Sequence, residues 1–194
     1  YQEAGATVID TAAQVFLESD MIVKVKEPQA IERKMLREGQ VLFTYLHLAP
    51  DPEQTHDLLK SKCTAIAYET VTDAAGGLPL LAPMSEVAGR LAPQVGAWTL
   101  QKANGGRGVL LGGVPGVAPA KVVVIGGGVV GTYAAKVASG MGADVTVLDR
   151  SLTRMRYLDD TFGGDFTTVF ASAGNTADLV AEADLVIGAV LVPG

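Results

Sequence analysis

Apolar residues occur along this chain in short continuous runs that alternate with longer stretches of helical periodicity. Short aliphatic runs are typical of strands buried in a parallel sheet, whereas apolar residues three and four apart indicate a helix with one buried face. In the first part of the chain this pattern predicts strands at 6–9, 21–25, 41–46 and 64–67, and helices at 11–18, 28–37 and 51–60.

This alternation predicts a parallel, doubly wound sheet with right-handed crossovers. Pro28 and Pro52 support two of the helices, because a proline in the first helical turn loses no hydrogen bond. A polar, glycine-containing stretch at 69–83 ends the region. We therefore expect a first domain over residues 1–83.

The segment after residue 83 has the pattern of a connecting helix. Ser85 is a favourable N-cap residue, and Pro93 should kink the helix or divide it in two. Such a helix suits a hinge between domains, and the alternative is an ordinary packed connector. A glycine- and proline-rich stretch at 104–119 predicts an ordered loop or hairpin. The helix carries one apolar stripe, formed by Val87, Leu91, Val95 and Trp98.

The stretch 121–150 has the pattern of a dinucleotide-binding unit. An apolar strand at 122–125 leads into the motif G-x-G-x-x-G at 126–131, then into a helix and a second strand at 145–148. No such motif occurs in the first domain. Dinucleotide binding is therefore predicted here, and the alternative is a doubly wound domain that uses its glycines only for packing.

Each residue of the motif has a physical role in dinucleotide binding. Gly126 permits a tight turn, Gly128 lets backbone N–H groups approach a pyrophosphate, and Gly131 allows the helix to pack closely on the sheet. Asp149 can accept hydrogen bonds from the adenosine ribose, and its charge disfavours the 2′-phosphate of NADP. Arg150 partly offsets that repulsion, but the pattern favours NAD as cofactor.

The pattern after the motif predicts two more strands, at 167–170 and 185–189, and two more helices, at 152–158 and 176–183. We expect residues 84–194 to form a Rossmann dinucleotide-binding domain with its connecting helix. The predicted fold class is thus α/β with two doubly wound parallel-sheet domains. The start at Tyr1 and the further strand that a six-stranded dinucleotide fold needs suggest an internal piece of a longer protein, with both domains incomplete.

Two polar residues follow consecutive predicted strands, Lys26 and His47. Ligands of such sheets bind beyond the carboxyl ends of the strands. A lysine offers a positive charge for a substrate carboxylate, and a histidine can give and take a proton near neutral pH. The alternative is a solvated lysine and a structural histidine. His56 lies in a polar helix and is expected at the surface.

Composition and charge exclude several classes of partner. The chain has 194 residues, 48% of them hydrophobic, and a formal net charge of −6, which argues against nucleic acid or an anionic membrane as partner. No apolar run is long enough to cross a bilayer, and no signal peptide is visible. Cys63 is the single cysteine, as is typical of a cytoplasmic protein. No cluster of ligand residues indicates a metal site.

Several longer runs resemble the alanine dehydrogenase family. They lie in order along the whole chain, at 23–28 (VKVKEP), 42–50 (LFTYLHLAP), 80–97 (LLAPMSEVAGRLAPQVGA), 105–117 (GGRGVLLGGVPGV) and 183–194 (ADLVIGAVLVPG). The resemblance implies reversible oxidative deamination of L-alanine by NAD to pyruvate and ammonium, in a homohexamer. Proton-translocating nicotinamide nucleotide transhydrogenase shares the architecture, and its nucleotide-binding component is the alternative. A nucleotide-binding module without chemistry is the third class.

The resemblance also implies roles for individual residues. Lys26 would hold the carboxylate or carbonyl of the substrate, and His47 would be the catalytic acid/base. Near Ala171 the family commonly has a serine, whereas this chain has Ser172. The residues assigned to the cofactor are Ser85, Val129 and Val130 at the phosphates, Asp149 and Arg154 at the adenosine ribose, and Val190 and Leu191 at the nicotinamide end.

Two further residues of the family's site would lie outside this sequence. The resemblance implies a substrate-binding arginine before Tyr1 and a catalytic aspartate after Gly194. The isolated chain of 194 residues is therefore expected to have no dehydrogenase activity.

Overall fold

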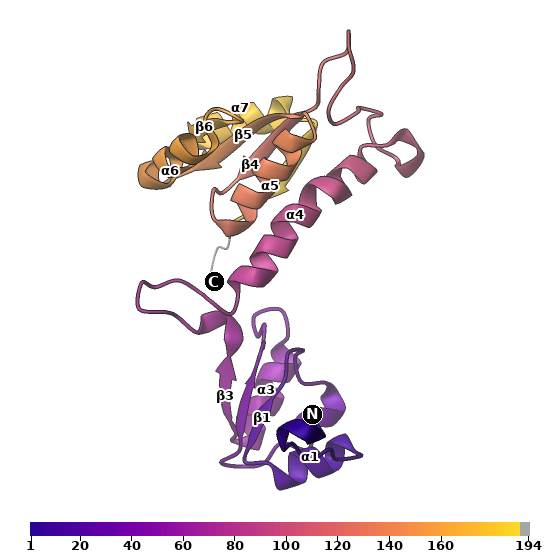
Figure 1. Ribbon diagram of the computed structural model, residues 1–194, viewed down its shortest axis with the longest axis vertical. Coiled ribbons are helices and arrows are strands. Elements are labelled where there is room, and N and C mark those ends of the chain that lie inside the picture. The colour runs from indigo at the N-terminus through magenta and orange to yellow at the C-terminus, as the bar shows by residue number, and fades with distance from the viewer. Residues whose placement is uncertain (191–194) are drawn as a thin grey trace. The chain divides into compact units, whose positions relative to one another are not determined.

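The protein consists of two compact units in a computed structural model that describes residues 1–190 (Figure 1). The first unit runs from Tyr1 to Leu81, and the second begins at Ala82. Each contains its own parallel β-sheet and its own hydrophobic core. The predicted fold class, α/β with two parallel-sheet units, is confirmed.

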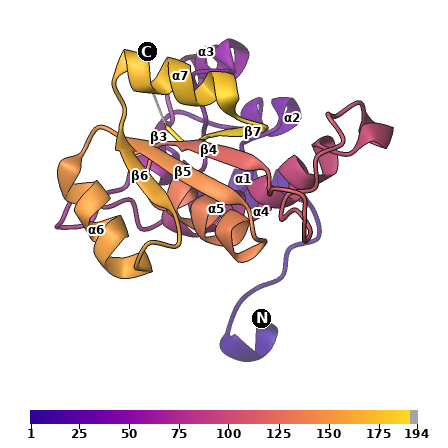
Figure 2. The same cartoon turned by 90° about the horizontal axis from the view of Figure 1, so that it is seen from above.

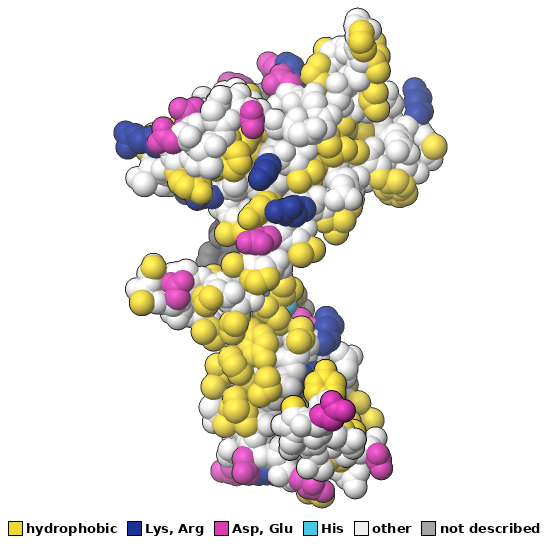
Figure 3. All heavy atoms as spheres, viewed as in Figure 1, with side chains coloured by type: hydrophobic (Ala, Val, Ile, Leu, Met, Phe, Trp, Pro, Cys, Tyr) yellow, Lys and Arg dark blue, Asp and Glu magenta, His cyan; other side chains and the backbone are white. Residues whose placement is uncertain are grey.

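The first unit has a three-stranded parallel sheet in the order β1-β2-β3. Its helices pack on the face that carries Ile22 and Leu42, and the opposite face exposes Met21, Val23 and Ile66. Figure 3 shows hydrophobic side chains gathered over this unit near β3. The elements are α1 (Ala12–Glu18), β1 (Met21–Val23), α2 (Ala30–Arg33), β2 (Val41–Thr44), α3 (Pro52–Ser61), β3 (Thr64–Ala67) and two 3-10 turns, η1 (Gln2–Ala4) and η2 (Tyr68–Thr70).

The predicted strand at 6–9 is wrong, because these residues form no strand. Val8 is 58% exposed, and the sheet's strand order contains no partner for this segment. A strand depends on a neighbouring strand for its backbone hydrogen bonds, so an apolar run of four residues does not suffice alone.

The predicted helix at 28–37 is much shorter in the structure, because α2 spans only Ala30–Arg33. Gln29 is the N-cap and forms a capping box with Glu32, so Pro28 precedes the helix and is not in its first turn. Beyond the helix, Leu36 enters the core from a turn, in which its N–H donates to the carbonyl of Arg33.

The second unit contains a four-stranded parallel sheet in the order β6-β5-β4-β7. Figure 2 shows α5 and α6 on one face of this sheet and α7 on the other, the arrangement of a doubly wound Rossmann sheet. The elements are α4 (Ala82–Thr99), η3 (Lys102–Asn104), β4 (Lys121–Ile125), α5 (Val129–Gly140), β5 (Asp144–Asp149), α6 (Leu152–Phe162), β6 (Thr167–Phe170), α7 (Ala173–Glu182) and β7 (Leu185–Gly188).

Helix α4 differs from its prediction at Ser85 and at Pro93. It begins at Ala82, so Ser85 lies inside its first turn rather than at the N-cap, and it continues through Pro93 as one helix. Pro93 belongs to its buried face, together with Gly89 and Gly96. Gly89 lets α4 approach α5 closely, since a Cβ there would lie 2.4 Å from the carbonyl oxygen of Val130, and Gly96 lets it approach Leu185 of β7.

The apolar stripe predicted on this helix is exposed. The stripe residues Val87, Leu91, Val95 and Trp98 are each at least half exposed. The buried face of α4 therefore consists of the small residues between them. Within residues 1–190, no helix combines the length and the hydrophobicity that a bilayer crossing requires.

Candidate functional site

The glycine motif forms the turn between β4 and α5, at the carboxyl edge of the second sheet. Gly126 has φ +102°, a conformation that favours glycine, and its N–H donates to the carbonyl of Leu148. A Cβ on Gly131 would lie only 1.7 Å from the carbonyl oxygen of Gly126. The turn and the first helical turn thus approach each other as closely as only glycine permits.

The N-terminus of α5 has the features of a phosphate-binding site. Gly128 is its N-cap and has no side-chain cap, so the first N–H groups of the helix, including those of Val129 and Val130, have no intrahelical acceptor. A Cβ on Gly128 would meet nothing within 4 Å. Open space beside unsatisfied donors at the positive end of a helix suits a pyrophosphate.

Asp149 and Arg154 bind the two peptide groups that flank Gly127 in this turn. Asp149 Oδ2 accepts the N–H of Gly127 at 2.7 Å, and Arg154 Nε donates to the carbonyl of Gly127 at 2.5 Å. Arg154 also donates to the hydroxyl of Thr132 at 2.7 Å and lies over the ring of Tyr157. The structure therefore brings the predicted ribose acceptor and its predicted neighbour together at the motif.

The other residues predicted to bind the cofactor lie in different elements of the second unit, and one of them lies outside the described residues. Ser85 lies one helical turn before Gly89, the residue by which α4 contacts the start of α5. Val190 is exposed and follows β7, with its side chain next to Gly126. Leu191 lies outside the described residues. Ser172 is the N-cap of α7, where its hydroxyl accepts the N–H of Asn175.

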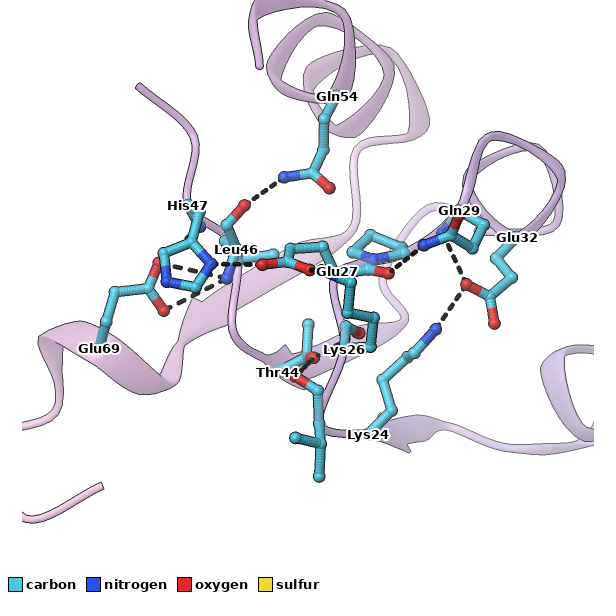
Figure 4. A network of polar contacts seen from close by, with 12 residues as sticks. Lys24, Lys26, Glu27, Gln29, Glu32, Thr44, Leu46, His47, Gln54 and Glu69 are labelled. Carbon is cyan, nitrogen blue, oxygen red and sulfur yellow. Dashed lines mark hydrogen bonds and ion pairs between the residues drawn. The ribbon is translucent and has the colours of Figure 1, made fainter. Parts of the chain in front are cut away.

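Lys26 and His47 lie in the loops that follow β1 and β2, the carboxyl ends of adjacent strands. These loops are tied together by Thr44, whose hydroxyl is within hydrogen-bond distance of the carbonyl oxygens of Val25 and Lys26. Glu27 then joins the two predicted residues directly (Figure 4). Its carboxylate pairs with Lys26 Nζ at 2.5 Å and with Nδ1 of His47.

The pKa of Glu27 is lowered to about 2, first by the hydrogen bond from Lys26, against the opposing effect of burial, and then by His47. Glu27 is thus ionised throughout the neutral range. The pKa of Glu32 is also lowered: its burial acts in the opposite direction, but the hydrogen bonds from Lys24 and from the N–H of Gln29 outweigh it.

The backbone of His47 adopts a left-handed conformation, with φ 45°, which is uncommon for a residue with a side chain. The carboxylate of Glu69 accepts the N–H of His47 at 2.7 Å and the N–H of Leu46 at 3.2 Å. Buried Gln54 donates from α3 to the carbonyl of Leu46. Groups from two other elements therefore fix the turn that carries the imidazole.

A cavity of about 390 Å³ lies at this edge of the first sheet. Its lining includes Lys26, Glu27, His47 and Gln54. A cation, a carboxylate and an imidazole around one cavity can bind a small anionic substrate and exchange protons with it. His56 is exposed on α3, as expected.

Glu27, Glu69 and Thr132 are among the residues of these two sites that the sequence did not single out. Glu27 follows Lys26 directly, and Glu69 follows β3 at the carboxyl edge of the same sheet. An acidic residue after the third consecutive strand was the available signal. Thr132 is buried, and its hydroxyl is 2.8 Å from the carbonyl oxygen of Gly128, a contact that only the fold reveals.

Comparison with known proteins gives matches along the whole chain. Two family models match, described as "Alanine dehydrogenase/PNT, N-terminal domain" over residues 1–88 and "Alanine dehydrogenase/PNT, C-terminal domain" over residues 92–194. The alanine dehydrogenase of Methanococcus maripaludis is 57% identical over 194 residues, which are 100% of this chain and 52% of that protein. The chain thus spans about half the length of the curated relatives that it matches.

Two solved structures are similar over the full chain. An L-alanine dehydrogenase has a TM-score of 0.85 at 52% identity, covering 100% of this chain and 54% of that one. A transhydrogenase from Sinorhizobium meliloti has a TM-score of 0.71 at 26% identity, covering 100% of this chain and 56% of that one.

Proposed function

The chain belongs to the alanine dehydrogenase/PNT family, and from this premise we propose that the whole protein is an NAD-dependent alanine dehydrogenase. This membership confirms the resemblance indicated by the sequence. The proposed reaction is L-alanine + NAD⁺ + H₂O → pyruvate + NH₄⁺ + NADH + H⁺, in both directions. The observation that carries the proposal is the network that joins Lys26 to His47 at one cavity.

In this reaction the first unit supplies the groups that bind the substrate and move protons. Lys26 holds the carboxylate or carbonyl oxygen of the substrate, since an ammonium has three donors and Glu27 uses only one. When water adds to the imine carbon, His47 accepts a proton. When the adduct collapses, the imidazolium returns a proton to the departing amine. We assign this chemistry to residues 1–83.

We assign cofactor binding to residues 84–194. The N–H groups at the start of α5, with Gly126, Gly128, Val129, Val130 and Gly131, would hold the pyrophosphate, with Ser85 beside it, and Val190 and Leu191 would line the nicotinamide end. The support is the open, uncapped helix N-terminus. When bound, NAD accepts the hydride from the α-carbon of alanine.

Asp149 supports NAD over NADP. The N–H groups of Gly127 and Ser151 fix its carboxylate at the end of β5, each at 2.7 Å. A carboxylate held there has acceptor capacity left for the ribose hydroxyls and would repel a 2′-phosphate. Arg154 donates to the carbonyl of Gly127, whose N–H Asp149 accepts, and would accompany Asp149 at the ribose.

The remaining partners follow from the family resemblance and the composition. We propose that the whole protein acts as a homohexamer in the cytoplasm, with L-alanine, pyruvate and ammonium as its small-molecule partners. The nucleotide-binding component of a proton-translocating transhydrogenase is the competing function. The lower identity to the transhydrogenase structure, 26% against 52%, favours the dehydrogenase.

Replacement of His47 by asparagine tests the proposed chemistry in the whole protein. Asparagine tolerates the left-handed backbone but cannot act as the acid/base. We expect kcat to fall about 10²- to 10⁴-fold, with the Kd for NADH changed by less than about twofold. His56→Asn, on the exposed face of α3, is the matched control. Equal turnover by the two variants would remove the acid/base role and shift the assignment to the transhydrogenase component.

A further inference from the structure

Glu27 occupies the centre of the network in the first unit (Figure 4). Oε1 contacts Nδ1 of His47, and Oε2 contacts Nζ of Lys26 at 2.5 Å. The Glu27 side chain is only 20% exposed, whereas those of Lys26 and His47 are 77% and 41% exposed. The carboxylate is therefore the more enclosed member, and the two groups that the proposed reaction uses extend from it toward solvent.

The protonation state of Glu27 determines which nitrogen of His47 can act as a base. Its pKa of about 2 leaves the carboxylate without a proton, so it can only accept a hydrogen bond. Nδ1 of His47 must then be the donor, and in the neutral ring the other nitrogen, Nε2, carries the free lone pair. Within residues 1–190, no hydrogen bond engages Nε2.

The other groups around His47 act on different parts of the residue. Glu69 binds the backbone N–H, and the ring of Tyr45 stacks on the imidazole at 5.8 Å between centroids. Lys26 is the nearby cation and contacts Glu27. Stacking restrains the plane of the ring but does not choose between its nitrogens. Among the charged groups Lys26, Glu27 and Glu69, only Glu27 contacts a ring nitrogen of His47.

We propose that Glu27 is a positioning residue: it fixes His47 in the tautomer with Nε2 free, and it holds the Lys26 ammonium at a set distance from that ring. The proposal rests on the proposed dehydrogenase function, for which it adds a residue. A single carboxylate thereby couples the substrate-binding cation to the acid/base group.

Two variants of the whole protein test this role. Glu27→Gln keeps the size and hydrogen-bonding capacity of the side chain, but its amide can donate to Nδ1 and so favour the wrong tautomer. We expect kcat to fall at least about 100-fold, while the Kd for NADH stays within about twofold. Glu38→Gln is the matched control, because Glu38 forms an exposed pair with Lys62 in the same unit.

Glu27→Ala provides a second, independent readout. The deletion removes a fragment that corresponds to acetate, so added acetate should restore kcat in a saturable way, whereas chloride at equal ionic strength should not. A purely structural role would show no such rescue. His47→Asn should not respond to acetate, since its missing group is the imidazole.

The outcomes separate this inference from the function on which it rests. If Glu27→Gln turns over like Glu38→Gln while His47→Asn is impaired, the positioning role is wrong and the dehydrogenase chemistry stands. If His47→Asn is also unimpaired, the proposed function itself fails. If Glu27→Ala does not fold, Glu27→Gln decides the question alone.

Discussion

The backbone conformation of His47 is one that elementary sterics do not favour for a residue with a side chain. A residue with a Cβ at φ 45° crowds its own carbonyl group, and such conformations persist where surrounding contacts enforce them. Here the carboxylate of Glu69 accepts the N–H groups of Leu46 and His47 and so holds the backbone in this conformation. Local backbone strain thus coincides with the residue to which we assign proton transfer.

This strain predicts that glycine at position 47 is more stable than alanine, the reverse of the order expected in a helix. His47→Gly and His47→Ala both remove the imidazole, but only glycine adopts the left-handed conformation without a steric penalty. We expect the glycine variant to have the higher free energy of unfolding, by about 1 kcal/mol in urea titrations.

The control for this comparison is Lys60, an exposed residue inside α3. There alanine should be the more stable substitution, by about 1 kcal/mol, because glycine is a poor helix former. Equal stability of the two His47 variants, or greater stability of the alanine variant, would show that the left-handed conformation is not present in solution.

At the scale of elements, the junction of β4 and α5 contains two kinds of glycine. Gly131 is needed for folding, whereas Gly128 leaves room for a ligand. Gly131 contacts the backbone of Gly126, so any side chain there displaces the helix from the sheet. Gly128 faces open space at the N-terminus of α5. The motif therefore needs glycine for two different reasons: close packing at Gly131 and open space for a ligand at Gly128.

Alanine substitutions at these glycines should have opposite effects. Gly131→Ala should destabilise the protein by at least about 3 kcal/mol, because backbone atoms cannot move aside cheaply. Gly128→Ala should fold normally but bind NADH at least about tenfold more weakly, since its methyl group enters the phosphate position.

Gly140→Ala, at the other end of α5, is the control: its Cβ also meets nothing within 4 Å, and NADH binding should not change. Unfolding transitions and NADH fluorescence titrations measure both quantities. Normal NADH affinity in Gly128→Ala would contradict the assignment of the phosphates to this helix terminus.

The elements with strong local signals could be predicted from the sequence. The strand at 64–67 and the helix capped by Asp51 matched closely, because each combines a clear apolar pattern with turn or cap residues. The strand at 6–9 and the N-cap at Ser85 were wrong for a different reason. A strand needs a partner, and the start of a helix depends on what the preceding residues contact.

The candidate site was predictable only in part. Lys26 and His47 were recognisable from their positions after strands, but Glu27 and Glu69 contact His47 across 20 and 22 positions of the chain. Such contacts depend on strand order and loop conformation, which residue patterns alone do not specify. The geometry therefore added the two carboxylates that contact His47, the residue to which we assign proton transfer.

At the scale of the whole molecule, the two units carry different parts of one proposed reaction. The first contains the groups to which we assign substrate binding and proton transfer, and the second contains the uncapped helix N-terminus and the carboxylate to which we assign NAD binding. The central claim is that both serve alanine dehydrogenation in the whole protein.

NADH oxidation by the whole protein, measured with pyruvate and ammonium separately and together, tests that claim most directly. The account predicts oxidation only when both are present, with L-alanine and NAD as products. Oxidation with pyruvate alone would indicate a hydroxy-acid dehydrogenase. Tight NADH binding without oxidation under any of these conditions would contradict the claim and favour the nucleotide-binding component of a transhydrogenase.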